Sequence, residues 1–558
     1  MILLLALLFV GLASLPSLHV RLWRAIVDRS TEAETAMFDA ERFSELSARR
    51  GTADEGKKRD ATCVIIGGSI AGCMMACVAS HHYARVVMVE PSTDDASRRS
   101  RVMQYDQVHI FSNFAVESLH RLWPGAFEAG AVARGGRFDD TSTLRFELLL
   151  GAHLFRWDER APRFGPSGKN ALAISRPVMQ DLLADLAAHH TPGVEVIRGR
   201  VTGMACDGKS GQVSQVHVVL HDGQPRPATT TTTTTTLNCG LLIDCSGPAQ
   251  VYRRLIRGDG RFTEPQRESY RINIAYASAT FALDATIRDR MPLPATTAAS
   301  RPTWGQASPI SFSSPLLTEQ SSYASMAHTD GDKCYLGWMK YDAAAQEMPT
   351  DLATFGKCMR ATYRANTGAE PGAWFDESMA LLAENEAATG NKVRFVHARG
   401  HDSYVCRIDA RNRRLPANLV LVGDSFCKLN PAFGQGTEKA MMDCLALSTS
   451  LGRWQAMADV MRDFEARRRT KTYTLFGFNR ALDLASPEVR KLNPTLAATT
   501  GRAQRTVLRT LLRYLDRYGD VARSNVLVGV VFGATGSAAL LHPWMLVAVV
   551  WGLFLGAR

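Results

Sequence analysis

The sequence lacks the cysteine and histidine patterns that build disulfide frameworks and metal sites. Its 11 cysteines are odd in number, scattered, and never spaced Cys-x-x-Cys. Such usage favours reduced thiols in a protein that faces the cytosol. The histidines are equally scattered, and the pairs His81–His82 and His189–His190 have no partners at metal-ligand spacing. We therefore expect no metal site.

Acidic residues are fewer than basic ones, which leaves a net charge of +11. No interleaving of aromatic and basic residues and no recognition motif accompanies this excess, so we expect no nucleic-acid partner. The content of 46% apolar and 21% charged residues excludes a disordered chain and fits a globular protein with membrane segments. A length of 558 residues allows two domains plus appendages.

Charged residues are absent from both ends of the chain. Met1–Val20 carries no Asp, Glu, Lys or Arg, and two arginines follow it. About 20 apolar residues span a hydrocarbon core of about 30 Å, so we expect an anchor there. A cleaved signal peptide is the alternative, although the positive start expected of one is missing. Ser524–Ala557 is also uncharged and is divided at His542-Pro543, which leaves a kinked span, a hairpin, two short helices or a buried C-terminal helix open.

A basic amphipathic stretch precedes the C-terminal apolar segment. Leucines and arginines occupy separate helical faces there: Leu508, Leu511, Leu512 and Leu515 on one, and Arg505, Arg509, Arg513 and Arg517 on the other. Such a helix suits an anionic membrane surface, and it suits equally well a helix that caps a domain.

Far upstream, Thr62–Glu90 has the pattern strand, glycine-rich turn, helix, strand and acid. Thr62-Cys-Val-Ile-Ile66 is a β-branched run typical of a strand buried in a parallel sheet, and it leads into Gly67-Gly-Ser-Ile-Ala-Gly72. A second apolar run, Arg85–Val89, ends at Glu90. This order and spacing match a dinucleotide-binding fingerprint, although an ordinary strand–turn–helix is the alternative.

Each position of the fingerprint has a physical role. Gly67 permits the tight turn, and Gly72 lets the helix pack on the sheet. The helix N-terminus points N–H groups at a pyrophosphate, and Glu90 can accept hydrogen bonds from a ribose. The predicted cofactor contacts in this half are therefore Gly67, Gly68, Ser69, Ala71, Gly72 and Glu90, with Ser69 in place of the usual middle glycine.

A second glycine-containing loop lies about 350 residues further on and also follows a buried-strand pattern. Asn418–Val422 is apolar and ends at Gly423-Asp424, and Pro431, Gly434 and Gly436 precede a helical pattern. The arrangement Gly-Asp-x-x-x-x-x-x-Pro-x-x-Gly-x-Gly resembles the second FAD motif of single-component (class A) FAD-dependent monooxygenases, which include hydroxylases and epoxidases.

The resemblance implies a role for each residue of this loop. Asp424 is expected to hydrogen-bond the ribityl chain of FAD, and Pro431 to lie beside the isoalloxazine. Gly434 and Gly436 would aim backbone N–H groups at the pyrimidine edge of the flavin, which becomes anionic on reduction. Cys427 and Asn430 form a Cys-x-x-Asn-Pro variant that occurs in a subset of the family.

Three weaker matches lie between the two motifs in the order of the family. The segment after the second strand implies an FAD contact from Arg101, and Ile174–Leu183 resembles a helix start that implies another from Arg176. Val201 would lie near the adenine, and Leu241–Gly247 resembles the Asp-x-Ser-Gly end of a strand. The resemblance covers about Ala61–Leu451.

The predicted fold class is α/β: a Rossmann-like FAD-binding domain of the aromatic-hydroxylase type, a β-sheet substrate domain and membrane-associated helical termini. We expect these boundaries: anchor 1–20, linker 21–60, first part of the FAD-binding domain 61–255, substrate domain 256–395, second part of the FAD-binding domain 396–455, basic helical region 456–523, and C-terminal membrane segment 524–557. Thr229–Thr236 is expected to be a loop expansion within a hairpin.

The resemblance implies an oxidoreductase with bound FAD. Only one fingerprint is present, so we expect NAD(P)H to bind transiently as reductant. In this family O₂ then forms a flavin C4a-hydroperoxide that hydroxylates or epoxidises the substrate. The two apolar ends favour a membrane protein and a lipophilic small-molecule substrate, such as a prenylated or terpenoid compound of secondary metabolism. Basic residues flank these ends on the inner side, so the catalytic domain is expected to face the cytoplasm.

Other functions stay open at this point. A polyprenyl reductase or a flavin halogenase would share the fold, although the sequence has no Trp-x-Trp-x-Ile-Pro signature of a halogenase. A membrane protein with a non-catalytic FAD-fold binding module is the alternative of another class. The catalytic acid–base residue is not assigned; Tyr404, Tyr276 and His109 are polar candidates, although such residues are more often structural.

Overall fold

The structure is a computed structural model that describes most of the chain from residue 58 to residue 555. The predicted anchor, 1–20, and nearly all of the predicted linker, 21–60, lie outside the described residues. Inside that range the description omits 93–97, 99–100, 108, 110, 140–143, 152, 156–170, 222–232, 294–303, 305–307, 316–317, 391–392, 394, 409–413, 520–522, 525, 528–539 and 541–542.

The fingerprint strand lies inside a seven-stranded sheet with the order β10-β9-β8-β2-β1-β11-β17. Strands β8, β2, β1, β11 and β17 are parallel, and β9 and β10 add an antiparallel extension. The four residues Cys63–Ile66 of β1 are buried, as their β-branched pattern predicts. The strands are β1 (Arg59–Ile66), β2 (Tyr83–Glu90), β8 (Val194–Cys206), β9 (Val213–Leu220), β10 (Thr234–Asn238), β11 (Leu241–Asp244) and β17 (Leu419–Leu421).

Part of the threonine run is strand rather than loop. Thr234, Thr235 and Thr236 belong to β10 and pair with Val219, Val218 and His217 of β9. Threonine is β-branched and therefore fits a half-exposed strand, which overrides the loop expectation for these residues.

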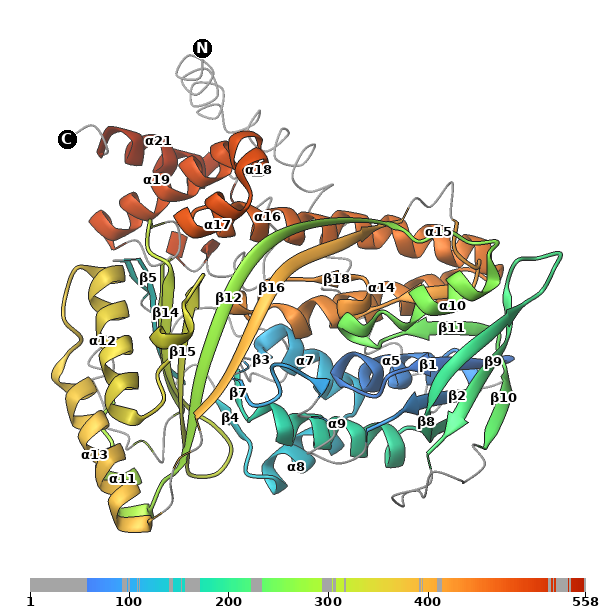
Figure 1. The fold of residues 1–558 in the computed structure, drawn as a ribbon, viewed down its shortest axis with the longest axis horizontal. Coiled ribbons are helices and arrows are strands. Elements are labelled where there is room, and N and C mark those ends of the chain that lie inside the picture. Colours follow the sequence, from blue (N-terminus) through green and yellow to red (C-terminus); the bar gives the residue numbers. More distant parts are fainter. Residues whose placement is uncertain are drawn as a thin grey trace.

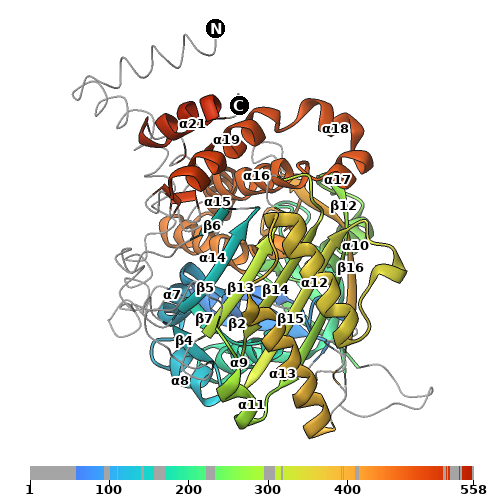
Figure 2. The same cartoon turned by 90° about the vertical axis from the view of Figure 1, so that its left-hand side faces the viewer.

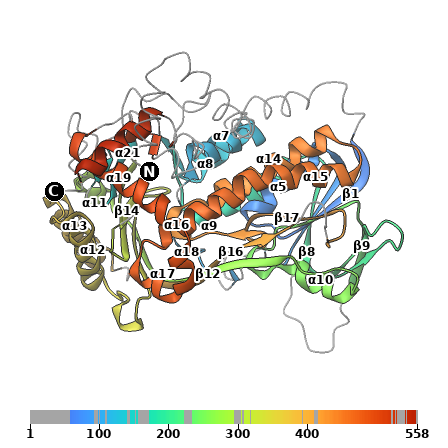
Figure 3. The ribbon, with the colours of Figure 1, turned by 90° about the horizontal axis from the view of Figure 1, so that it is seen from above.

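Helices cover one face of this sheet. Helix α5 follows the glycine-rich turn and is buried along nearly its whole length, because it lies between α9 and α14. Figure 3 shows α14 and α5 running side by side. The elements of this layer are α5 (Ile70–Ser80), α7 (Asn113–Leu122), α8 (Ala126–Ala133), α9 (Arg176–His189), α14 (Gly436–Arg453) and α15 (Met457–Arg468), and α10 (Val251–Asp259) lies on the other face against β8.

The second large sheet has eight strands in the order β18-β16-β12-β15-β14-β13-β5-β6. Its long strands β12 and β16 run from one half of the molecule into the other (Figure 1). Helices α12 and α13 cover its outer face (Figure 2), where Trp338, Phe355 and Phe375 are buried. The elements are β5 (Leu144–Leu150), β6 (His153–Phe155), β12 (Gln266–Ala282), α11 (Ala285–Arg290), β13 (Ser308–Ser314), β14 (Ser322–His328), β15 (Lys333–Tyr341), α12 (Leu352–Thr367), α13 (Ala373–Thr389), β16 (Phe395–Arg407) and β18 (Cys427–Lys428).

A small three-stranded sheet and a group of C-terminal helices complete the described fold. The small sheet has the order β3-β7-β4. Its strands are β3 (Phe111–Ser112), β7 (Ala171–Ala173) and β4 (Arg137–Asp139), and the C-terminal helices are α16 (Thr474–Asp483), α17 (Pro487–Leu492), α18 (Pro494–Thr499), α19 (Arg502–Tyr518) and α21 (Pro543–Leu555).

The basic amphipathic helix caps the protein core. The leucine face of α19 is buried, with Leu515 at 0% and Leu511 at 1% exposure, and α19 packs on α16, β6 and α21. A Cβ on Gly552 of α21 would come within 2.2 Å of the Thr510 carbonyl oxygen, which shows how closely the two helices approach. The apolar C-terminal helix therefore buries part of its surface against its neighbour.

The predicted membrane localisation, with the catalytic domain facing the cytoplasm, is contradicted. Within the described part of the chain, no helix combines the length and the apolar character needed to cross a membrane. Helix α21 has 13 residues, which reach about 20 Å against a hydrocarbon core of about 30 Å. The prediction failed because an apolar composition is shared by membrane spans and by helices buried in a protein.

Candidate cofactor and active site

One cavity of about 700 Å³ joins the two glycine-containing segments. It extends from the ends of β1 and β2 to the inner face of the second sheet. Every predicted cofactor-binding residue except Gly72 lines it: Gly67, Gly68, Ser69, Ala71, Glu90, Arg101, Arg176, Val201, Asp424, Pro431, Gly434 and Gly436. The structure thus brings together residues that are up to 369 positions apart, Gly67 and Gly436.

The turn after β1 depends on its glycines. Gly67 has a φ of +98°, and a Cβ there would lie 2.8 Å from the Cys245 carbonyl oxygen. A Cβ on Gly72 would lie 1.9 Å from the Gly67 carbonyl oxygen. Gly72 therefore packs the helix onto the turn and does not face the cavity. Helix α5 begins here with no side-chain cap and no acidic residue in its first turn, which suits an anion at its N-terminus.

Glu90 stands at the end of β2 and closes the turn from the other side. Its carboxylate accepts hydrogen bonds from the backbone N–H of Gly68, at 2.6 Å, and of Ser92, at 2.7 Å. Arg101 donates to the Ser92 hydroxyl and lies 3.7 Å from Glu90. A carboxylate has about four acceptor positions, so Glu90 keeps capacity for a further donor such as a ribose hydroxyl.

Ser69, the departure from the fingerprint, makes its contacts toward α9. Its hydroxyl donates to Gln180 Oε1 at 2.9 Å and accepts from Arg176 Nη2 at 3.1 Å. Gln180 also donates to the Gly68 carbonyl oxygen at 3.0 Å. Gln180 was missed from the sequence, although it lies one helical turn after Arg176 on the same face of α9.

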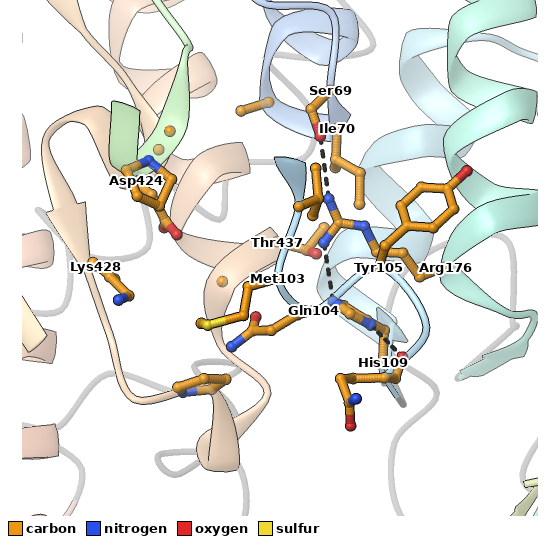
Figure 4. Close-up of a pocket in the computed structure, with 18 of the residues that line it drawn as sticks. Ser69, Ile70, Met103, Gln104, Tyr105, His109, Arg176, Asp424, Lys428 and Thr437 are labelled. Carbon is orange, nitrogen blue, oxygen red and sulfur yellow. Dashed lines mark hydrogen bonds between the residues drawn. The ribbon is translucent and has the colours of Figure 1, made fainter. Parts of the chain in front are cut away.

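Arg176 and His109 form a half-buried pair at the cavity wall (Figure 4). Arg176 Nη1 donates to His109 Nε2 at 3.1 Å, and His109 Nδ1 donates to the Gln107 carbonyl oxygen at 2.8 Å. An arginine can only donate, so the imidazole is neutral with its proton on Nδ1. Burial, and secondly the Arg176 charge, lower the pKa of His109 to about 3.

The guanidinium of Arg176 forms no ion pair with any residue that the structure describes. Among the described residues it contacts only uncharged groups, and its Nε has no hydrogen-bond partner. Burial lowers its pKa to about 10, although the more distant Asp424 acts in the opposite direction. A half-buried cation that forms no ion pair with the described residues is suited to an anionic ligand, because such a ligand restores the lost solvation.

Asp424 lies across the cavity from Arg176 (Figure 4) and forms an ion pair with a buried lysine. Lys439 is 0% exposed, and its Nζ contacts Asp424 Oδ1 at 3.0 Å and donates to the Cys427 carbonyl oxygen. Burial acts to lower the pKa of Lys439, but Asp424 and its other anionic neighbours raise it overall. Lys439 was not predicted, because nothing in the local sequence distinguishes it from a surface lysine.

Backbone and side-chain contacts connect the second loop to its surroundings. The Asp244 carboxylate of β11, in the predicted Asp-x-Ser-Gly motif, accepts from the Ser425 hydroxyl at 3.0 Å. Tyr404 donates to the Asp424 carbonyl oxygen at 2.7 Å, and it is not among the cavity-lining residues, so its role is structural. Asn430 caps the 3₁₀ turn Pro431–Phe433 by accepting from the Ala432 N–H at 3.0 Å.

The loop leads into an open helix start. Gly434 has a φ of +65°, and a Cβ on Gly434 or Gly436 would meet nothing within 4 Å, so both positions face open space. Helix α14 begins at Gly436 with no side-chain cap. Gly434, Gly436 and Thr437 line the cavity, so the N-terminus of α14 lies beside it.

The inner face of the second sheet supplies an apolar wall. Tyr276 is the polar exception among the side chains of this wall that the structure describes in β12: it is 3% exposed, and its hydroxyl has no hydrogen-bond partner. Burial and the nearby Asp483 raise its pKa well above the ordinary value, so the phenol stays neutral. The apolar residues of the wall are Leu148, Leu150, Phe312 and Met339 of the sheet, joined by Leu429 and Phe433 of the second loop.

The described residues contain no group of three or more His, Cys, Asp or Glu side chains that could hold a metal ion. The expectation that no metal takes part in the chemistry stays a prediction.

Comparison with known proteins places the fold. No protein-family model matches this sequence, and no curated protein matches it significantly. Among solved structures, the chain is similar to a flavoprotein/dehydrogenase from Cytophaga hutchinsonii, with 14% identity and a TM-score of 0.54 over 89% of this chain and 100% of that one. At such low identity this likeness shows the fold alone: the chain has the mixed α/β fold of that flavoprotein, which confirms the predicted fold class apart from the membrane-associated termini.

Two further solved structures match with TM-scores below 0.5. PqsL, a probable FAD-dependent monooxygenase from Pseudomonas aeruginosa, shows 18% identity and a TM-score of 0.49 over 80% of this chain and 98% of that one. The flavin-dependent brominase Bmp2 shows 14% identity and a TM-score of 0.47 over 89% of this chain and 100% of that one.

Proposed function

We propose that this chain is an FAD-dependent monooxygenase that uses NAD(P)H and O₂ to hydroxylate or epoxidise a lipophilic small molecule. The observation that carries the proposal is the single cavity of about 700 Å³, which both predicted flavin motifs and an apolar wall line together. The likeness of the fold to a flavoprotein, over 89% of this chain and all of that one, supports it.

The residues around the cavity fit FAD. The N-terminus of α5 and the Arg176 guanidinium would hold the pyrophosphate, and the orphaned Nε of Arg176 gives a specific reason for an anion there. Glu90 and Val201 would flank the adenosine, with Arg101 beside Glu90. Asp424, oriented by Lys439, would hold the ribityl chain. Pro431, Gly434 and Gly436 would face the ring system.

Bound FAD would supply the activation of O₂ with electrons from transiently bound NAD(P)H. The chain itself would position the ring and exclude water from it. The N-terminus of α14 places positive potential beside open space at Gly434 and Gly436, and this potential would stabilise an anionic group bound there. The apolar wall limits solvent at the reacting atoms.

The apolar wall of the cavity, rather than the ends of the chain, supports a lipophilic substrate. Leu148, Leu150, Phe312 and Met339 present apolar surface on the side away from the fingerprint turn. An electron-rich ring or alkene, as in a prenylated or terpenoid compound, fits such a wall. Tyr276 also lines this cavity and its hydroxyl has no hydrogen-bond partner, so a polar atom of the substrate would supply one.

The experiment that tests the function begins with purified full-length protein. We expect a flavin absorption band, and O₂ uptake with NAD(P)H that a converted substrate stimulates. Metabolite comparison in ¹⁸O₂, with and without the protein, should reveal a product that carries one labelled oxygen atom. Asp424→Ala should purify largely without flavin; a full FAD complement in that variant would contradict the site.

The other candidates give different results in the same assays. A reductase would consume NAD(P)H without O₂ uptake, and a halogenase would require halide. A non-catalytic binding module would show no turnover with any substrate, and absence of a flavin band from correctly folded protein would refute the proposed function.

A further inference from the structure

Helix α16 contacts the cavity loop at two points, although it lies outside both predicted flavin motifs. Asn479 and Asp483 stand one turn apart on the same face of α16, and they are 0% and 1% exposed. Side chains at this spacing project together from a helix. Both make their shortest loop contacts through hydrogen bonds of 2.6 Å.

Asp483 holds the residue that precedes Pro431. Asn430 Nδ2 donates to Asp483 Oδ1 at 2.6 Å, and Asn430 Oδ1 caps the turn Pro431–Phe433. The two ends of one amide thus connect the carboxylate to the turn. Asn430 is 0% exposed, so this contact does not compete with bulk water.

Asn479 holds the other end of the same turn. Its Nδ2 donates to Gln435 Oε1 at 2.6 Å, and Gln435 is the N-cap residue of α14. The segment between Asn430 and Gln435 contains Pro431 and Gly434, which line the cavity. One helical turn of α16 therefore contacts both ends of this segment.

Asp483 also joins the loop to the second sheet. Its Oδ2 accepts from Tyr270 of β12 at 2.6 Å, and its Oδ1 accepts from Tyr341 of β15 at 2.6 Å. Tyr341 is in turn 2.9 Å from the hydroxyl of Tyr323 on β14. The carboxylate is thus shared by the loop and by strands whose neighbours form the apolar wall.

The burial of the Asp483 carboxylate at the end of a helix lowers the stability of the fold. It is a buried carboxylate in the last turn of a helix, where the helix dipole disfavours negative charge. Burial raises its pKa to about 6, although its hydrogen bonds to Tyr270, Tyr341 and Asn430 act to lower it. A buried polar junction that costs stability is often retained because it fixes one geometry.

We infer that Asn479 and Asp483 are positioning residues, which fix the Asn430–Gln435 segment against the ring of the flavin and set its place relative to the apolar wall. The part of this inference that concerns FAD depends on the proposed function; the part that concerns the loop does not. It predicts that α16, a helix beyond the flavin motifs, controls the geometry of the cavity.

The test uses full-length protein and the variants Asp483→Asn and Asn479→Leu. Amide hydrogen exchange of residues 430–436, measured without added flavin, should accelerate about tenfold or more in both variants, which corresponds to about 1.4 kcal/mol. FAD titration of the apoprotein should show a Kd raised about tenfold. Asp463→Asn is the matched control: Asp463 lies on α15 and bonds Ser450 and Arg467, away from the loop, so loop exchange should stay unchanged.

A swap variant separates positioning from general loss of stability. Asn430→Asp combined with Asp483→Asn restores an amide–carboxylate pair in the reverse direction, and the carboxylate introduced on the loop can still cap the turn. We expect it to recover part of the loop protection that Asp483→Asn loses. Unchanged loop exchange in Asn479→Leu and Asp483→Asn, or no recovery in the swap, overturns the inference. Failure of the wild type to bind FAD refutes the proposed function instead, and the exchange measurement still decides the role of α16.

Discussion

The two glycine-containing segments of the cavity differ in what holds them. The shape of the turn Gly67–Gly72 is set mainly by its own backbone, because Gly67 has a φ of +98° and a Cβ on Gly72 would lie 1.9 Å from the Gly67 carbonyl oxygen. Glu90 and Gln180 add hydrogen bonds to Gly68. The loop Gly423–Gly436 is fixed by side chains from α14, α16 and β11. A motif that is determined locally can be recognised from sequence almost completely. When distant residues hold a motif in place, the sequence of the motif contains only one of the two groups in each contact.

The variant Gly72→Ala has the largest expected effect and tests whether the first turn depends on its own glycines. The added Cβ would lie 1.9 Å from a backbone oxygen, and backbone cannot move aside as the end of a flexible side chain can. We expect a loss of about 3 kcal/mol of stability or more, measured by denaturant unfolding, together with loss of flavin.

Gly258→Ala is the matched control for this variant. Gly258 is a helical glycine in α10 whose Cβ would meet nothing within 4 Å. It should be neutral or stabilise the protein by up to about 1 kcal/mol. Equal stability of Gly72→Ala and the wild type would show that the turn relaxes and that its glycines are not required.

The variant Lys439→Met tests whether the second loop depends on side chains from other elements. It keeps the length of the side chain and removes the charge. Asp424 loses its cation and the Cys427 carbonyl loses a donor. Asp424 is 39% exposed and can regain water, so we expect a loss of about 2 kcal/mol rather than the larger cost of a fully buried pair. FAD affinity should fall about tenfold, because the carboxylate is no longer oriented.

Lys340→Met, which removes a surface pair with Glu347, serves as the control and should cost less than about 1 kcal/mol. If Lys439→Met retains wild-type FAD affinity, Asp424 does not depend on Lys439, and the second loop is more locally determined than we infer.

A pH titration tests the wall between the two segments, where His109 contacts Arg176. The folded-state pKa of His109 is about 3, against about 6.5 when unfolded. The unfolded chain therefore binds the extra proton first as pH falls, so this histidine's contribution to stability is present above about pH 6.5 and is lost toward pH 3. Between pH 7 and pH 4.5 we expect the wild type to lose about 2 kcal/mol more than His109→Gln does.

Denaturant unfolding of both proteins across that range measures the difference, and His190→Gln, at an exposed position outside the cavity, should follow the wild type. If the free energies of unfolding of the wild type and His109→Gln fall in parallel with pH, His109 becomes exposed to solvent before its imidazole titrates. The contact between His109 and Arg176 would then not be a rigid part of the cavity wall.

The same contrast explains how much could be predicted from sequence. β1, α5, β2 and the placement of the two motifs around one cavity depend on short-range patterns, so strand runs, Gly67, Glu90 and the Asp424–Gly436 spacing were sufficient. Local patterns did not predict three residues of the site, because each one acts through a partner elsewhere in the chain. The partner is 112 positions away for Gln180, 15 for Lys439 and 53 for Asp483. The C-terminal segment was misassigned for a related reason: only the fold shows that α19 covers part of α21.

Ser69 gives the smallest and most discriminating test, because its side chain links the turn to Gln180 and Arg176 of α9. Ser69→Gly restores the usual fingerprint and removes the hydroxyl that bonds Gln180 and Arg176. We expect a loss of about 1 kcal/mol, from one exchanged hydrogen-bond pair and from added backbone freedom. In a Gln180→Leu background, Ser69→Gly should lower the free energy of unfolding by less, because the hydrogen bond between the two side chains is already gone. A double-mutant cycle measures the coupling energy between Ser69 and Gln180. A coupling near zero would show that Ser69 is a neutral replacement for glycine rather than a link to α9.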